Sequence, residues 1–179
     1  MSALSPVQEK FILHWGEMGT RWGINRTVAQ VHALLFITAR ALPADEIVEA
    51  LSVARSNVST SLKELQGWGI VRVVHVIGDR RDHFESMKDV WEMFRVIIEE
   101  RKRREIDPTL ALLRECVGDI EKMKSDADTT TKERIGELLK FFETMSGWYD
   151  QMRKVPTSVV LRAVKLGDKV FKLLEAVGR

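Results

Sequence analysis

The amino-acid sequence predicts a mainly α-helical protein that contains one β-hairpin. Apolar residues recur at steps of three and four along most of the chain, which is the spacing of one face of an α-helix. The exception is residues 70–77, a run rich in β-branched side chains that precedes the turn-like residues 78–81. All four prolines fall where a helix could begin, as the fixed φ angle of proline favours.

Length and composition restrict the class of protein. The 179 residues are 45% hydrophobic and 30% charged, which is enough apolar material for a globular core. The single cysteine, Cys116, excludes an internal disulfide, and we interpret it as a buried structural thiol rather than a redox sensor. The first fifteen residues do not resemble a signal peptide, and no apolar run reaches the roughly 18 residues of a membrane span. We therefore expect a cytoplasmic protein with no membrane partner.

The sequence lacks the common motifs of catalysis and metal binding. It holds no glycine-rich phosphate loop, no Gly-x-Ser-x-Gly elbow and no His-Glu-x-x-His pair. No Cys and His residues have the spacing of a structural zinc site. His75 and His83, on either side of the predicted turn, are interpreted as ordinary strand residues rather than a metal or pH-sensing pair. We therefore expect no enzyme, no metal and no cofactor.

Four helices are predicted before the hairpin. The first covers residues 6–22, because Ser5 and Gln8 form a capping box around Pro6. Its expected buried stripe is Val7, Phe11, Trp15, Met18 and Trp22. The second covers residues 26–37, with Val28, Val31, Leu34 and Leu35 expected inward. The third covers residues 44–51, with Ile47, Val48 and Leu51 inward, and the fourth covers residues 55–66, with Val58, Leu62 and Leu65 inward.

The third and fourth helices are predicted to be joined by a sharp turn over residues 52–57, with Val53 filling the corner. If the inward residues of the fourth helix face the core, Ser56, Thr60 and Lys63 point away from it. Asn57 and Ser59 then lie on the flanks. This small polar face could enter the major groove of DNA, although a merely solvated helix surface would show the same pattern.

The predicted hairpin, whose second strand covers residues 82–86, carries Arg80 and Arg81 at its tip. Residues 52–81 contain five basic and two acidic residues, whereas the whole chain has a formal net charge of only +2. Positive charge is therefore concentrated locally, as contact with DNA phosphates requires. The two arginines could reach a minor groove or flanking phosphates, or they could only protect an exposed turn.

Longer helices are predicted after the hairpin. One begins near Met87 and runs into the charged residues 99–105. Asp107 and Pro108 have the order of residues that starts a new helix. Residues 125–129 are predicted to form a loop, and a further helix is predicted to begin at the capping box of Thr130. Two later stripes alternate steps of three and four, as helix seams do. A second copy of the chain or packing within one chain could cover them. The expected dimer residues are Ile135, Leu138, Phe142, Met145, Tyr149, Val160, Val170 and Leu174.

Several segments carry a resemblance to a known family. They are residues 23–26 (Gly-Ile-Asn-Arg), 53–59 (Val-Ala-Arg-Ser-Asn-Val-Ser), 62–65 (Leu-Lys-Glu-Leu) and 68–71 (Trp-Gly-Ile-Val). Over about residues 6–105 the chain resembles transcriptional regulators of the MarR superfamily, GbsR type. The resemblance implies a winged helix-turn-helix that binds operator DNA as a homodimer through its N- and C-terminal helices. It implies DNA contacts by Arg55, Ser56, Asn57, Ser59, Thr60 and Lys63, and by Asn25, Arg26, Arg80 and Arg81 at the wing and its flank.

The predicted organisation has three parts: an N-terminal helix (1–22) that joins the dimer interface, a winged helix-turn-helix (23–87) and a helical dimerisation or regulatory region (88–179). Some members of the resembled family respond to small molecules, so Trp91, Trp148 and Tyr149 are candidate effector contacts. Core packing would also explain these aromatic residues. The predicted function is a homodimeric, sequence-specific DNA-binding repressor, and the alternative is a winged-helix module that docks a protein partner.

Overall fold

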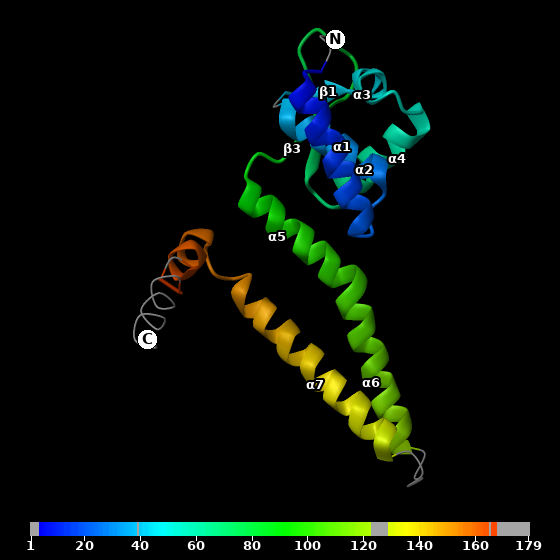
Figure 1. Ribbon diagram of the computed structural model, residues 1–179, viewed down its shortest axis with the longest axis vertical. Coiled ribbons are helices and arrows are strands. Elements are labelled where there is room, and N and C mark those ends of the chain that lie inside the picture. The colour runs from blue at the N-terminus through cyan, green and yellow to red at the C-terminus, as the bar shows by residue number, and fades with distance from the viewer. Residues whose placement is uncertain (1–3, 39, 123–128, 165, 168–179) are drawn as a thin grey trace. The chain divides into compact units, whose positions relative to one another are not determined.

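The computed structural model describes residues 4–38, 40–122, 129–164 and 166–167, which divide into two compact units, Met1–Ile97 and Ile98–Arg179. Figure 1 shows the first unit as a group of short helices around a small sheet, and the second as long helices. None of the described helices has the length and apolar character needed to cross a membrane.

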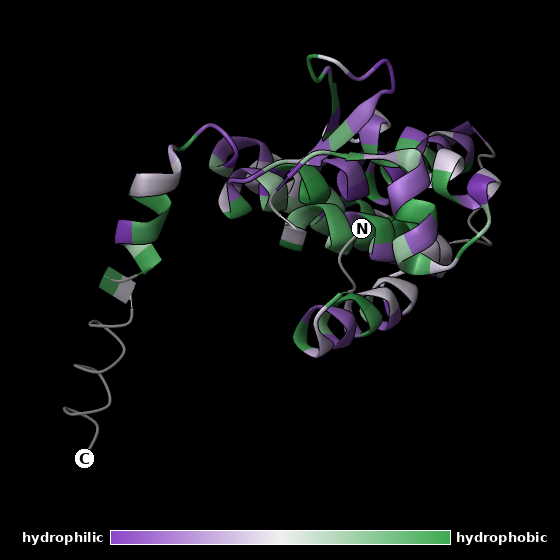
Figure 2. Cartoon of the chain, turned by 90° about the horizontal axis from the view of Figure 1, so that it is seen from above, coloured by the Kyte–Doolittle hydropathy of each residue, from purple (hydrophilic) through white to green (hydrophobic). Residues whose placement is uncertain are grey.

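The first unit has the predicted order of helices and hairpin. Its elements are α1 (Pro6–Arg21), α2 (Arg26–Thr38), β1 (Leu42–Pro43), α3 (Ala44–Leu51), α4 (Arg55–Gly67), β2 (Val71–Val74) and β3 (His83–Ser86), and α5 (Val90–Arg101) begins in this unit. The strands form an antiparallel sheet in the order β1-β3-β2, with Val71 opposite Ser86 and Val74 opposite His83. The strands are shorter than predicted, so a long loop joins β2 to β3 and stands out from them at the top of Figure 2.

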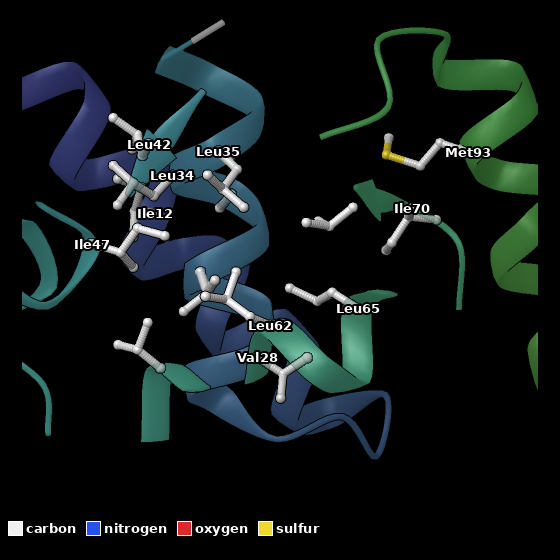
Figure 3. Packing of buried hydrophobic residues seen from close by; sticks show 14 residues of the cluster. Ile12, Val28, Leu34, Leu35, Leu42, Ile47, Leu62, Leu65, Ile70 and Met93 are labelled. Atoms are coloured by element: carbon white, nitrogen blue, oxygen red, sulfur yellow. The ribbon is translucent and has the colours of Figure 1, made fainter. Parts of the chain in front are cut away.

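The core of the first unit is built around α2. All four predicted inward residues of this helix are buried: Val28, Val31, Leu34 and Leu35. Figure 3 shows side chains from α1, α4 and β1 directed toward the same core, including Ile12, Leu62 and Leu42. Each fully buried aliphatic side chain of this kind stabilises a fold by about 1.5–3 kcal/mol, so α2 holds the other elements together.

The predicted stripe of α1 is confirmed in its middle and wrong at its ends. Phe11 and Trp15 pack partly buried against the core, and Met18 is half-buried. Val7 and Trp22 are 74% and 53% exposed, whereas Ile12, Gly16 and Gly19 are buried. The cause is a close approach of α1 to α2: a Cβ atom added to Gly19 would lie 2.5 Å from the Cβ of Ala29. A periodicity that counts only large apolar residues does not detect a buried helix face that is formed by glycines.

The strand β1 was not predicted. Its two residues, Leu42 and Pro43, pair with Phe84 and His83 of β3 and are both buried. A two-residue strand has no alternating pattern, so the sequence offers no signal for it. It covers one edge of the hairpin and anchors β3 to the residues that precede α3.

The second unit is helical in its described parts. Residues 98–101 complete α5, a π-helical turn η1 (Lys102–Ile106) follows, and then come α6 (Asp107–Lys122), α7 (Thr129–Met152) and helical residues 157–164 and 166–167. In Figure 1, α6 and α7 lie side by side, and Arg114 pairs with Glu143 between them at 2.9 Å. Phe142 and Tyr149 of α7 are half-buried, whereas Leu138, Phe141, Met145 and Trp148 are 45–57% exposed.

Two predicted helix starts in the second unit agree with the structure to within one residue. α6 begins at Asp107, as the order of Asp107 and Pro108 predicts. The helix is not preceded by a break, because η1 runs directly into it and Asp107 donates its N–H to the carbonyl of Lys102. Pro108 has no N–H for the carbonyl four residues earlier, and a wider π-turn accommodates its ring. α7 begins at Thr129, one residue before the predicted start at Thr130, so Thr129 belongs to this helix rather than to the predicted loop. The other residues of the predicted loop, 125–128, lie outside the described part of the chain.

Candidate nucleic-acid interface

The turn between α3 and α4 positions a polar helix face. Ser52 ends α3 in the left-handed region, with φ of 51°, and Val53 packs against the core as predicted. Val58, Leu62 and Leu65 are buried on the inner side of α4. The predicted DNA-facing residues Ser56, Asn57, Ser59, Thr60 and Lys63 are all exposed on the same helix. The structure therefore gathers them on one accessible surface, which we call the α4 face.

The start of α4 favours an anion. Its first turn contains no acidic residue, so the positive end of the helix dipole and its free N–H groups are not offset by the helix itself. Arg55, the first residue, is exposed and forms an ion pair with Asp45 of α3. This pair was not predicted, because a spacing of ten residues across a turn leaves no periodic signal.

The hairpin tip is closed by a network around Asp79. The Asp79 N–H donates to the carbonyl of Val76 at 3.1 Å, and the Asp79 carboxylate accepts the Arg81 N–H at 2.9 Å. The Arg81 guanidinium donates to both carboxylate oxygens at 2.6–3.0 Å, and these hydrogen bonds hold the pKa of Asp79 well below its usual range. Arg80 is exposed and has no ion pair within the described chain.

The two histidines near the tip differ in environment. His83 lies on β3 and is buried; its Nδ1 atom is 2.9 Å from the carbonyl oxygen of Arg81, and its Nε2 atom is 3.5 Å from Asp79. His75 lies in the exposed loop rather than in a strand, 3.9 Å from Asp82, so its strand assignment is wrong. No group of three or more potential metal ligands occurs in the part of the chain that the structure describes.

The two predicted flank residues lie at the start of α2. The Asn25 side chain accepts the N–H of Thr27 at 2.8 Å, which is the bond of a helix cap. Arg26 is exposed as the first residue of α2. The Asn25 side-chain oxygen therefore has a structural partner, while the Arg26 side chain is accessible.

A buried polar pair connects α2 to the base of the hairpin. The Nε2 atom of His32 lies 3.3 Å from the Oγ atom of Ser86, and both residues are buried. Burial lowers the pKa of His32 from 6.5 to about 4. His32 is therefore neutral near pH 7 and links β3 to the central helix without a buried charge.

The first unit also contains an apolar cavity of about 230 Å³ that is partly open to solvent. Its walls come from α1, the α1–α2 link, α2, the end of α4, the residue before β2 and α5, and comprise His14, Trp15, Met18, Gly19, Trp22, Ile24, Ala29, His32, Leu65, Trp68, Ile70 and Ile97. None of the predicted effector residues lines it. Trp91 and Trp148 are at least half exposed, and Tyr149 donates to Glu99 at 3.0 Å. Burial and this bond raise the pKa of Tyr149 to about 12.

The helix-turn-helix, the exposed polar face of α4 and the hairpin beside it define a winged helix-turn-helix protein. Residues 22–82 match the sequence model of the MarR family. The chain is 25% identical over 140 residues to the HTH-type transcriptional repressor GbsR of Bacillus subtilis (strain 168), and 77% of each protein is covered. Its fold is similar to a crystal structure of a transcriptional regulator, with a TM-score of 0.60 and 20% identity over 83% of this chain and 97% of that one. The chain is therefore similar to transcriptional regulators of the MarR family, and the match to the family model lies in the winged helix-turn-helix.

The environment of His32 generates a pH prediction. Below pH 6.5 the unfolded chain takes up a proton on His32 that the folded chain does not take up until about pH 4. The free energy of unfolding is therefore at its full value above pH 6.5. It falls as the pH drops from 6.5 to about 4, and His32 alone accounts for a loss of about 3 kcal/mol. Urea unfolding at several pH values measures this loss. His32→Gln should show a shallower pH dependence than the wild type, and equal slopes would contradict the assignment.

Proposed function

We propose that the protein is a sequence-specific DNA-binding repressor that acts as a homodimer. The observation that carries the proposal is the exposed α4 face: small polar side chains and one lysine on a helix whose opposite side is fully buried. Serine, threonine and asparagine can hydrogen-bond to base edges, and their small size lets the helix backbone approach the floor of the major groove.

The charged groups around this face support the same function. Lys63 on α4 and Arg80 at the hairpin tip are exposed cations without an ion pair among the described residues. Arg55 is held beside the start of α4 by Asp45, which orients its guanidinium and reduces the freedom that it would lose on binding. Arg26 adds a further accessible cation in the same unit. Together these side chains supply phosphate contacts around a polar reading surface.

The dimer is proposed to use the apolar stripe on α7. Leu138 and Met145 of the predicted seam lie in this stripe with Phe141 and Trp148, and all four side chains are 45–57% exposed. Their spacing of three, four and three residues is that of a helix seam. Ile135, Phe142 and Tyr149 lie beside this stripe on α7 and are half-buried, as is Val160. Val170 and Leu174 lie outside the described residues. A second copy of the chain offers the same stripe as its partner.

A small-molecule effector is proposed to bind in the apolar cavity. The cavity wall includes Leu65 and Trp68 at the end of α4 and Ile70 just before β2. A ligand in contact with these residues would be coupled both to the α4 face and to the hairpin. Binding energy that differs between two positions of α4 would then change DNA affinity. Trp91 in the first unit, and separately Trp148 and Tyr149 in the second unit, remain candidate effector contacts.

The DNA-binding proposal predicts a steep and specific salt dependence. Duplexes selected from a random pool should bind more tightly than scrambled duplexes in fluorescence anisotropy, and affinity should fall as salt rises. Lys63→Ala with Arg80→Ala should reduce the slope of log affinity against log salt by about 2 per bound protomer, because two phosphate contacts are lost. The pair Lys132→Ala and Arg134→Ala removes equal charge from α7 and should leave the slope unchanged. Equal weak binding to every duplex would favour the protein-docking alternative.

The dimer proposal predicts a mass of twice the 20.5 kDa chain in light scattering. Phe141→Glu with Met145→Glu should give the monomer mass, because two buried carboxylates would lack partners in the seam. Lys140→Glu changes the charge of α7 by the same amount away from the stripe and should remain dimeric. A wild-type monomer at every concentration would contradict the proposal.

The effector proposal predicts that one compound in a metabolite panel raises the melting temperature by about 5–10 °C at a hundredfold excess over its Kd. Met18→Trp would fill part of the cavity and should abolish this rise, whereas Trp91→Ala should keep it. Loss of the rise only in Trp91→Ala would instead place the effector at the residues predicted from the sequence.

A further inference from the structure

The hairpin tip has an apolar apex. Ile77 is fully exposed, at 104% of its reference surface, and the adjacent Val76 is 44% exposed. Ile77 and Gly78 form the centre of a turn that is closed by the hydrogen bond from the Asp79 N–H to the Val76 carbonyl. Gly78 has a φ of 86°, which a residue with a side chain rarely adopts. Exposed turns usually carry polar residues, so a fully solvated isoleucine there needs an explanation.

The apex is held in shape from within the loop. The paired bonds between Arg81 and the Asp79 carboxylate close the side of the turn opposite Val76. At the base of the hairpin, the Met87 N–H donates to the Ile70 carbonyl at 2.8 Å. Because this turn is preformed, presenting Ile77 to a partner costs little conformational entropy. The apex is therefore suited to insertion into a narrow site.

The charges beside the apex indicate the chemistry of its partner. Figure 2 shows the loop changing from a hydrophobic to a hydrophilic stretch along its length. The hydrophilic stretch includes Arg80, which is exposed, and Arg81. A partner must therefore offer a narrow site that accepts the aliphatic side chain of Ile77, with negatively charged groups at the edges of that site for the arginines to contact. The minor groove of duplex DNA has this character, since phosphates line its edges and apolar side chains can enter between stacked bases.

We propose that Ile77 is a wedge that enters the minor groove next to the segment bound by the α4 face, partly unstacks one base step and bends the duplex. This inference rests on the proposed DNA-binding function and extends it to the shape of the bound DNA. Affinity then depends on a base step that α4 does not contact. Flexible pyrimidine–purine steps are favoured there, because they unstack at lower cost than A-tracts do.

The test uses the full-length protein and duplexes selected by it, with 2-aminopurine at successive positions on both sides of the selected site. Wild-type protein should raise the fluorescence at one flanking step, where the base is unstacked, and should shorten the distance between dyes at the duplex ends. Ile77→Ser should lose both signals and bind roughly tenfold more weakly. Ile77→Leu should retain them. Leu112→Ser, which alters an exposed leucine of α6, should bind and bend like the wild type.

Two results would overturn the wedge. One is wild-type binding with no fluorescence change at any flanking step, and the other is full unstacking by Ile77→Ser. Either result leaves the DNA-binding function intact, since binding itself is measured by anisotropy in the same samples. Failure of the wild type to select any duplex would remove the proposed function together with the wedge.

Discussion

The burial of α2 is the constraint on which the rest of the first unit depends. The helix lies against Gly16 and Gly19 of α1 on one side, its apolar residues pack with those of α4 on another, and its buried His32 reaches β3. A helix covered on several sides cannot rotate or slide without exposing apolar surface to water, and each Å² so exposed costs about 25 cal/mol of free energy. Both surfaces that we propose to contact DNA, the α4 face and the hairpin, are thus fixed to one central element.

The two surfaces are positioned by different kinds of interaction. The α4 face is directed outward by apolar burial on its reverse side, from Val58 to Leu65. The hairpin tip has almost no apolar support and is shaped by polar bonds around Asp79. Apolar burial holds a helix firmly but does not shape a loop, whereas directional hydrogen bonds can shape a loop of eight residues. As a result, α4 is held rigidly by its buried side, and the hairpin tip is held by local hydrogen bonds.

The sequence predicts most of the fold and the content of the candidate surface. Capping signals and apolar periodicity place α1 to α4 to within one residue at each end, and the exposed residues of α4 follow from its phase. The errors share a cause: Gly19, β1 and the π-turn act through contacts or backbone geometry that side-chain hydrophobicity does not encode. The Asp45 to Arg55 pair and the apolar cavity likewise arise only when separate elements meet.

The π-turn before Pro108 has a consequence for the helical phase of the second unit. One additional residue in a single turn sets every later side chain back by about 100° around the axis, relative to an uninterrupted α-helix. Leu110 and Leu113 are buried in this phase, whereas Leu112 is 58% exposed. Reverting the wide turn to a regular one would move a different set of side chains into the place that Leu110 and Leu113 now occupy. The position of one proline therefore selects which face of α6 is covered.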